Sequence, residues 1–165
     1  MLEIQRLKIT IITDNGTYGF DGTFTKGLNF IASSDNTCGK SSVLEAIYYC
    51  LGFEEIIGGQ TEKVLTPVYK SNIKDEEDEY VVLQSSMFLQ VSNGYDVITI
   101  MRCAKMENRK SKLITVFYSP IDNIYDKDTD KDDMYVHSQN AAQHEKGFHA
   151  FLDKFMGMEL PIVAT

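Results

Sequence analysis

The sequence predicts an α/β fold, with a mixed sheet around one helix and an antiparallel β meander beside it. Three observations lead to this class. The apolar segment 28–32 is followed by a polar loop and then by a stretch of helical periodicity. Residues 80–118 alternate apolar and polar side chains between turn signals. Finally, the 165 residues are 43% hydrophobic and include only 3 Pro, so we expect one domain, 1–165, with its own core.

Three strands are predicted before residue 33. In the first, Leu7, Ile9 and Ile11 lie on one face and polar side chains on the other, the pattern of a half-buried strand. An Asp-Asn-Gly turn precedes 18–24, which can run back as a second short strand. After a Lys-Gly turn, 28–32 is mostly apolar, so we expect a third strand that is buried inside the sheet.

One amphipathic helix is predicted directly after the polar stretch 33–40. Gly52 stands where a residue in the left-handed conformation would end this helix. The apolar residues that recur at helical spacing are Val43, Leu44, Ile47, Cys50 and Leu51. The order of strand, polar loop and helix is the most informative feature of the sequence.

The remainder divides into four regions. Residues 53–79 show weak periodicity and contain the acidic block 75–79, which predicts an irregular insertion with a short helix or strand. The meander 80–118 contains three strands, separated by a Ser-Asn-Gly turn and a basic loop. The Asp-rich segment 121–140 predicts an acidic loop, and 144–156 predicts a terminal helix. The apolar stripe of this last helix consists of Phe148, Phe151, Leu152, Phe155 and Met156.

Composition narrows the classes of function. Lys and Arg number 16 against 24 Asp and Glu, a net charge of −8, so any nucleic-acid contact requires a local basic patch. No segment is apolar for long enough to span a membrane, and the charged N-terminal segment does not resemble a signal peptide. Cys38, Cys50 and Cys103 are too far apart for a metal pattern and odd in number, which favours a reducing compartment. We therefore expect a cytoplasmic protein with no membrane partner.

The polar loop stands in the register of the phosphate-binding pattern G-x-x-x-x-G-K-[ST]. Such a loop directs backbone N–H groups and a helix N-terminus at phosphates. Lys40 would reach the β- and γ-phosphates, and the Ser41 hydroxyl would ligate Mg²⁺. The alternative is a Ser- or Asn-capped helix with a solvated lysine. The candidate nucleotide-binding residues are Ser34, Asp35, Asn36, Thr37, Cys38, Gly39, Lys40, Ser41 and Ser42.

This loop and its surroundings resemble the N-terminal half of an SMC-type ATPase head. The family includes the chromosome-condensing SMC proteins, the double-strand-break repair ATPases, RecN and RecF. The similarity is carried by LEIQRLKITII, KGLNFIAS, DNTCGKSSVLEAIYYCLG and YDVITIMRCAK. The family loop is G-x-N-G-x-G-K-S/T-S/T followed by L-x-D/E-A-I, and this chain departs from it at Ser34 and Thr37, where the family has glycine. The matching residues are Asn36, Gly39, Lys40, Ser41, Ser42, Leu44, Glu45, Ala46 and Ile47.

The resemblance implies a P-loop NTPase half-head, with the predicted helix as its Walker A helix and with ATP and Mg²⁺ as cofactors. In the family, a long coiled coil leads to a C-terminal half that carries the ABC signature, the Walker B carboxylates and the switch histidine. The implied partners are that C-terminal half, on the same or a separate chain, a second head on ATP binding, and DNA. We expect this lobe alone not to hydrolyse ATP, because it lacks a residue to orient the attacking water. Gln139 and Gln143 are default candidates for the Q-loop glutamine of the family.

A basic cluster lies at a predicted hairpin tip and consists of Lys105, Arg109, Lys110 and Lys112. Related heads bind DNA across β surfaces of this kind, so the resemblance makes these cations candidate phosphate contacts. The alternative is an ordinary solvated hairpin loop. His137, His144 and His149 match no metal-ligand spacing, so surface or core positions are expected, and Arg102 could face either side of its strand.

Three hypotheses follow. The leading one is an ATP-binding lobe of an SMC-like, DNA-associated ATPase, with a role in DNA repair, chromosome maintenance or anti-phage defence. The second is a degenerate lobe that binds no nucleotide and acts as a scaffold or interaction domain. Ser34 and Thr37 favour this second hypothesis, whereas Lys40 and Ser41 oppose it. A small-molecule kinase is the third, and it is disfavoured because no βαβ units follow the β-rich region.

Overall fold

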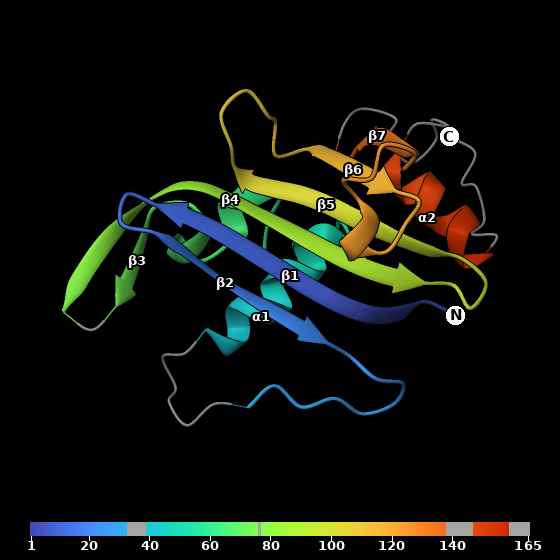
Figure 1. Ribbon diagram of the computed structural model, residues 1–165, viewed down its shortest axis with the longest axis horizontal. Coiled ribbons are helices and arrows are strands. Elements are labelled where there is room, and N and C mark those ends of the chain that lie inside the picture. The colour runs from blue at the N-terminus through green and yellow to red at the C-terminus, as the bar shows by residue number, and fades with distance from the viewer. Residues whose placement is uncertain (33–38, 76, 138–146, 159–165) are drawn as a thin grey trace.

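A single antiparallel sheet organises the fold. The computed structural model describes residues 1–32, 39–75, 77–137 and 147–158 (Figure 1). The strand order is β2-β1-β4-β5-β6-β7, and β3 pairs with β4 off this path. The strands are β1 (Glu3–Thr13), β2 (Thr17–Thr23), β3 (Asn72–Asp75), β4 (Asp78–Ser92), β5 (Val97–Lys105), β6 (Leu113–Phe117) and β7 (Lys131–Tyr135).

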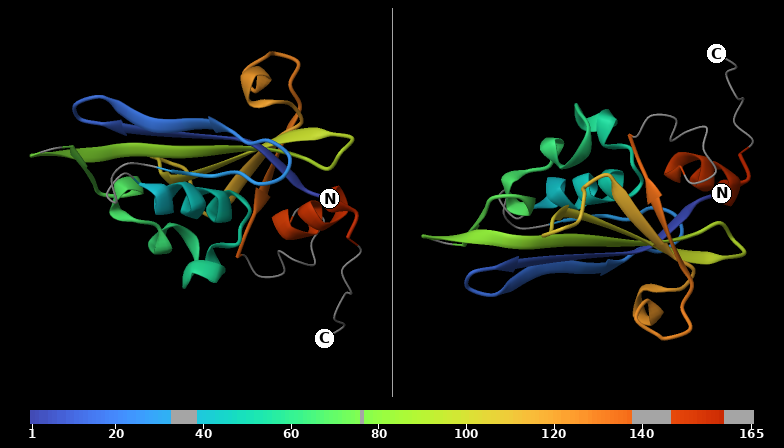
Figure 2. Two further views of the ribbon diagram at one scale, coloured as in Figure 1. Left: turned by 90° about the horizontal axis from the view of Figure 1, so that it is seen from below. Right: turned by 90° about the horizontal axis from the view of Figure 1, so that it is seen from above.

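Helices lie on both sides of this sheet but mainly on one. Figure 2 shows the helices 40–50 and 148–156 and the 3-10 helices within 54–69 on the same side, and the loop that carries the 3-10 helix 121–123 on the other side. Within the described ranges, no helix is long and apolar enough to cross a membrane. The helices are α1 (Lys40–Cys50), η1 (Glu54–Ile57), η2 (Thr61–Val64), η3 (Pro67–Tyr69), η4 (Ile121–Asn123) and α2 (Phe148–Met156).

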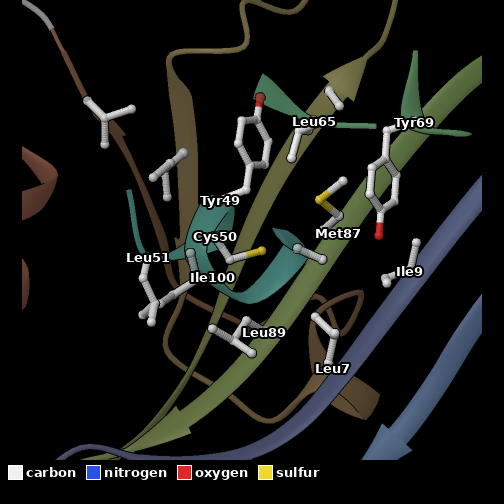
Figure 3. Packing of buried hydrophobic residues seen from close by; sticks show 14 of the residues in the cluster. Leu7, Ile9, Tyr49, Cys50, Leu51, Leu65, Tyr69, Met87, Leu89 and Ile100 are labelled. Atoms are coloured by element: carbon white, nitrogen blue, oxygen red, sulfur yellow. The ribbon is translucent and has the colours of Figure 1, made fainter. Parts of the chain in front are cut away.

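The main core lies between α1 and the sheet (Figure 3). Leu7 of β1 and Leu89 of β4 are directly opposite each other in the register and are both fully buried. Tyr49 and Cys50 of α1 pack onto this face and are also fully buried. Burial of an aliphatic or aromatic side chain contributes roughly 1.5–3 kcal/mol, so these contacts are what holds α1 in place.

A smaller cluster fills part of the opposite face of the sheet. Its buried members are Phe88, Phe117, Ile121 and Ile124. An ion-pair network closes the same side, because the Arg6 guanidinium donates to Asp21 at 2.8 Å and to Asp122 at 2.9 Å. Arg6 thereby ties the η4 loop to the β1–β2 hairpin.

Several predicted elements are confirmed. β1 buries its predicted apolar face, and β4, β5 and β6 form the predicted meander. α1 begins at Lys40, and Gly52 has a φ of 70° two residues after its end. Gly157 likewise ends α2 with a φ of 64°. At these positions the left-handed backbone favours glycine, which is why the sequence marks the helix ends so clearly.

The predicted mixed sheet is corrected to a mostly antiparallel, open one, while the content remains mixed α/β. All paired strands run antiparallel, and the one parallel contact in the described residues is an isolated bridge between Tyr135 and Gly147. The predicted buried strand 28–32 is not a strand. Both edges of β1 are occupied by β2 and β4, so no position beside β1 is open to this segment.

Exposure shows how far 28–32 departs from the prediction. Leu28 is 79% exposed and Phe30 is 84% exposed. Between them, the Asn29 amide folds back on the preceding turn, accepting from the Thr25 N–H at 2.9 Å and donating to the Thr25 carbonyl at 2.8 Å. The segment is apolar in composition, but it pairs with no strand, and its Asn29 side chain bonds to the preceding turn.

Two further predictions need correction. The acidic loop predicted over 121–140 contains η4 and the strand β7, whose run of three charged residues at an edge position conceals its β character. In the helical stripe predicted for α1, Leu44 is 52% exposed, and Ala46 and Tyr49 are buried instead. The start of the terminal helix at 144 lies outside the described residues, within which α2 begins at Phe148.

Candidate functional site

The N-terminal end of α1 is where the sequence predicts a phosphate site. Gly39 has φ 69° and ψ 19°, a left-handed conformation that favours glycine, and Lys40 begins the helix directly after it. Gly39, the second glycine of the phosphate-loop pattern, therefore occupies a position where the left-handed backbone favours glycine. Five predicted contacts lie outside the described residues, namely Ser34, Asp35, Asn36, Thr37 and Cys38.

The first turn of α1 has the electrostatic character of an anion site. It contains no acidic side chain, and no side chain among the described residues caps it by a hydrogen bond. A helix N-terminus presents backbone N–H donors and the positive end of the helix dipole. Ser41 is exposed beside Lys40, so its hydroxyl is accessible to a ligand. A hydroxyl oxygen is a suitable ligand for Mg²⁺, so the residues present are compatible with the implied cation.

Ser42 is engaged with the rest of the protein. Its hydroxyl lies 3.3 Å from the Thr66 hydroxyl, and its carbonyl accepts a 2.6 Å hydrogen bond from the Tyr69 hydroxyl. In the next turn of α1, the Glu45 carboxylate accepts a hydrogen bond from the Thr66 N–H at 2.9 Å. Burial raises the pKa of Tyr69, so this phenol stays protonated and keeps donating. Ser42, predicted as a nucleotide contact, therefore braces the first turn against the η3 segment.

Incompletely covered surface lies beside α1 and along the connection that leads to it. A cavity of about 450 Å³ is bounded by the start of β1, by residues of the segment 24–29 and by Ile47 of α1. Outside the lining of this cavity, Leu28 and Phe30 of the β2–α1 connection and Leu44 of α1 are exposed. Within the described chain, the region that precedes and begins α1 is thus both polar at the first turn and incompletely covered around it.

The predicted basic cluster lies at the β5–β6 connection, but three of its four cations are bonded within the protein. Lys105 donates to a backbone carbonyl of β4 at 2.6 Å, and Arg109 donates to a hydroxyl of β6 at 2.7 Å. Lys112 donates to the His137 carbonyl at 3.2 Å. Lys110 and Lys112 are exposed, so they are the members most accessible to a phosphate.

At the opposite end of α1, the structure reveals a buried ion pair that the sequence did not predict. Arg102 Nη2 lies 2.7 Å from Glu54 Oε1, Arg102 Nη1 lies 3.0 Å from Oε2, and both side chains are 0% exposed. Arg102 also donates to the carbonyls of Tyr49 and Ser111, each at 2.7 Å. Its guanidinium carbon lies 3.8 Å from the centre of the Tyr49 ring, a cation–π contact. Arg102 therefore faces the core and binds the last turn of α1 to β5.

The carboxylate of Glu54 has further donors. His137 Nε2 lies 2.8 Å from Oε1, and the Thr61 N–H donates to the same atom at 3.1 Å. Burial acts to raise the pKa of Glu54, but the hydrogen bonds and charge of Arg102 outweigh it, and the pKa lies below its ordinary value. A second histidine, His149, lies with its ring centre 6.3 Å from that of His137. His137 thus contacts the buried ion pair directly, and His149 lies next to His137.

This buried cluster of Arg102, Glu54 and His137 has the properties of a structural contact that stabilises the fold. The donor groups of Arg102 and the oxygens of Glu54 have partners, and such fully satisfied pairs are costly to break. In the described part of the chain, no three His, Cys, Asp or Glu side chains are arranged to hold a metal ion. Gln139, Gln143 and His144 lie outside the described residues.

The sequence contains a partial signal for the Arg102–Glu54 ion pair. An arginine in the middle of the apolar strand 97–105 indicates that a buried partner is needed. That partner, Glu54, lies 48 residues away in the weakly periodic insertion, so no local pattern could identify it.

Comparison with known proteins found no matching family model, no matching curated protein and no matching solved structure.

Proposed function

We propose that this chain is the ATP-binding N-terminal lobe of an SMC-like, DNA-associated ATPase, which needs a C-terminal lobe for hydrolysis. The observation that carries the proposal is the left-handed Gly39 immediately before a helix that begins with Lys40 and Ser41 and has no acidic first turn. This is the arrangement in which a loop and a helix N-terminus bind phosphate.

Several of the proposed contacts must contribute to the free energy of ATP binding. A helix dipole contributes roughly 0.3–1 kcal/mol to an anion at its terminus, whereas micromolar affinity requires about 8 kcal/mol. The backbone N–H groups of the loop and the ammonium group of Lys40 must therefore supply much of the remainder. Ser41 would complete the site as a ligand of Mg²⁺ between the phosphates.

The exposed segment around Leu28 and Phe30 is the surface at which we propose that the C-terminal lobe binds. Leu28 and Phe30 lie in a segment with the composition of a buried strand, yet they are exposed in this lobe. Covering them would contribute roughly 1.5–3 kcal/mol for each side chain. We expect the second lobe to pack against this segment. We expect DNA to contact the assembled head, with the exposed Lys110 and Lys112 as phosphate contacts of the basic cluster. The biological role we propose is DNA repair, chromosome maintenance or anti-phage defence.

A degenerate lobe that acts as a scaffold is the second candidate, and one observation favours it. Ser34 and Thr37 replace two of the three glycines in the family loop. Where such a loop requires a left-handed backbone, a side chain costs on the order of 1 kcal/mol or more.

Calorimetric titration with ATP and with a non-hydrolysable analogue, both with Mg²⁺, separates the two candidates. We expect saturable binding that Lys40→Ala abolishes and that Ser34→Gly with Thr37→Gly tightens. Lys127→Ala is the matched control, because Lys127 is an exposed lysine in the η4–β7 connection, outside the proposed site.

The titration is then repeated with the C-terminal lobe supplied. Binding that appears only in this second titration supports a composite site. Absence of binding in both titrations contradicts the ATP-binding proposal and favours the scaffold.

A further inference from the structure

The first helical turn of α2 docks on the end of α1 through a histidine. His149 Nε2 lies 3.1 Å from the carbonyl oxygen of Gly52, which follows the last turn of α1. The imidazole stacks on the Phe53 ring at 5.8 Å between centres and 10° between planes. The approach is close, because a Cβ atom on Gly52 would lie 2.7 Å from His149 Nε2. Glycine at this position thus serves both the left-handed turn and the docking of the imidazole.

Among the described residues, a buried arginine and a second histidine lie near His149, and the buried carboxylate between them already has partners. Arg102 is buried nearby, and His137 lies edge-on to the His149 ring with 6.3 Å between centres. Glu54 is the buried carboxylate of the cluster, and it already accepts from both Arg102 and His137. Among the described residues, the titratable and charged groups around the imidazole and on its helix are Arg102 on β5, Glu54 and Glu55 on η1, His137 after β7, and Asp153 and Lys154 on α2.

We propose that His149 and the Gly52 carbonyl form an acid-sensitive latch, which holds α2 against the C-terminal end of α1 while the imidazole is neutral. The neutral ring donates from Nε2 to Gly52, and its partly buried stack against Phe53 is apolar. A proton on Nδ1 leaves the Nε2 donor in place, but it adds a positive charge to a partly buried ring near His137 and Arg102. This inference does not depend on nucleotide binding.

The direction of the pH effect follows from the environment. Burial lowers the pKa of His149 below its ordinary value of 6.5, and the charges of His137 and Arg102 lower it further, against the opposing effect of Gly52 and Glu54. Because the undocked imidazole binds a proton more readily, docking is strongest above pH 6.5 and weakens as the pH falls through 6.5 toward the lower pKa. One proton can raise the opening equilibrium by at most about tenfold per pH unit.

Opening of the latch would uncover apolar surface. Phe148 is 0% exposed and Leu152 is 1% exposed in the docked helix. The far end of α2 is held separately, since the Asn93 side-chain amide donates to the Phe155 carbonyl at 3.0 Å. Release at the His149 end therefore exposes core side chains before the rest of the sheet unfolds.

Hydrogen exchange measured by mass spectrometry tests this latch on the full chain. Amides of 148–158 are compared with those of β4 from about pH 7.5 to about pH 5, after correction for intrinsic exchange rates. We expect protection of α2 to fall several-fold across this range while that of β4 is retained. His149→Gln keeps a donor for Gly52 but does not titrate, so its α2 protection should not change with pH. Lys154→Gln, which removes a charge from the same helix, should respond as the wild type does.

Two results would overturn the latch: a pH response of α2 that His149→Gln preserves, or α2 and β4 losing protection together. If His149→Gln does not fold, the NMR titration of the His149 ring in the wild-type chain decides the matter. A midpoint below 6.5 supports the latch, and a midpoint at or above this ordinary value contradicts it.

Discussion

The two ends of α1 differ in nearly every physical respect. At the C-terminal end, Tyr49 and Cys50 are fully buried, and Arg102 binds the Tyr49 carbonyl. Burial raises the pKa of Cys50 to about 12, so its thiol stays neutral. At the N-terminal end, Ser41 is exposed and no described side chain caps the helix. One helix therefore has an end that the fold secures internally and an end at which we propose that an external anion binds.

The largest expected effect comes from breaking the buried end. Arg102→Leu leaves the Glu54 carboxylate buried without its main partner, and we expect a loss of about 3–5 kcal/mol in the free energy of unfolding. Chemical denaturation measures this loss.

The matched control for this substitution is Arg6→Leu, whose ion pairs are partly exposed and should contribute about 1 kcal/mol or less. Equal losses in the two variants would show that the buried pair has no special role.

A smaller effect is expected from Tyr49→Phe at the same end. The Tyr49 hydroxyl donates to the Cys103 carbonyl at 3.0 Å and to the Ser111 carbonyl at 3.3 Å. Removing this donor should cost about 1–3 kcal/mol, because buried carbonyls lose a partner. Chemical denaturation again provides the measurement, and an unchanged stability would mean that water replaces the hydroxyl.

Lys40→Ala tests the open end and should separate binding from folding. We expect ATP affinity to fall at least about tenfold, or about 1.4 kcal/mol, while the free energy of unfolding changes by about 0.5 kcal/mol or less. Calorimetry and denaturation on the same preparation give both values. A large loss of stability would instead make Lys40 a structural residue, and the contrast between the two ends would disappear.

The smallest effect is expected for Phe30→Ser near the open end. Because Phe30 is 84% exposed, this change should alter the free energy of unfolding by less than about 0.5 kcal/mol. Phe148→Ser, at a fully buried position, is the comparison and should cost several times more. Thermal unfolding of both variants checks the difference, and a destabilised Phe30→Ser would indicate that the segment is packed in solution.

An element of the fold could be predicted from the sequence where neighbouring residues determine it, and not where residues far apart in the chain do. β1 was predicted correctly because alternation records which face is buried, and α1 because a glycine follows it at Gly52. The strand predicted over 28–32 was wrong because apolar composition alone cannot show whether a segment pairs with a sheet or folds back on a turn, as the Asn29 side chain does here. β7 was missed because a charged edge strand resembles a loop.

The position of the candidate site follows from the sequence, but its contacts with the rest of the fold do not. Gly39, Lys40 and Ser41 lie at the helix start where their pattern places them, and the Ser42 hydroxyl lies 3.3 Å from that of Thr66. Three cations of the basic cluster are drawn into hydrogen bonds with other strands and loops, which no local pattern records.

Local patterns in the chain are enough to predict the start of α1, the ends of both helices and the alternating strands, because these follow from backbone preference and from periodicity within a few residues. The pairing of Arg102 with Glu54, the contact of His149 with Gly52 and the position of 28–32 outside the sheet are set by the tertiary fold. They cannot be read from the sequence because buried charges and sheet positions are matched between residues far apart in the chain, and the folded core determines which partners are within reach.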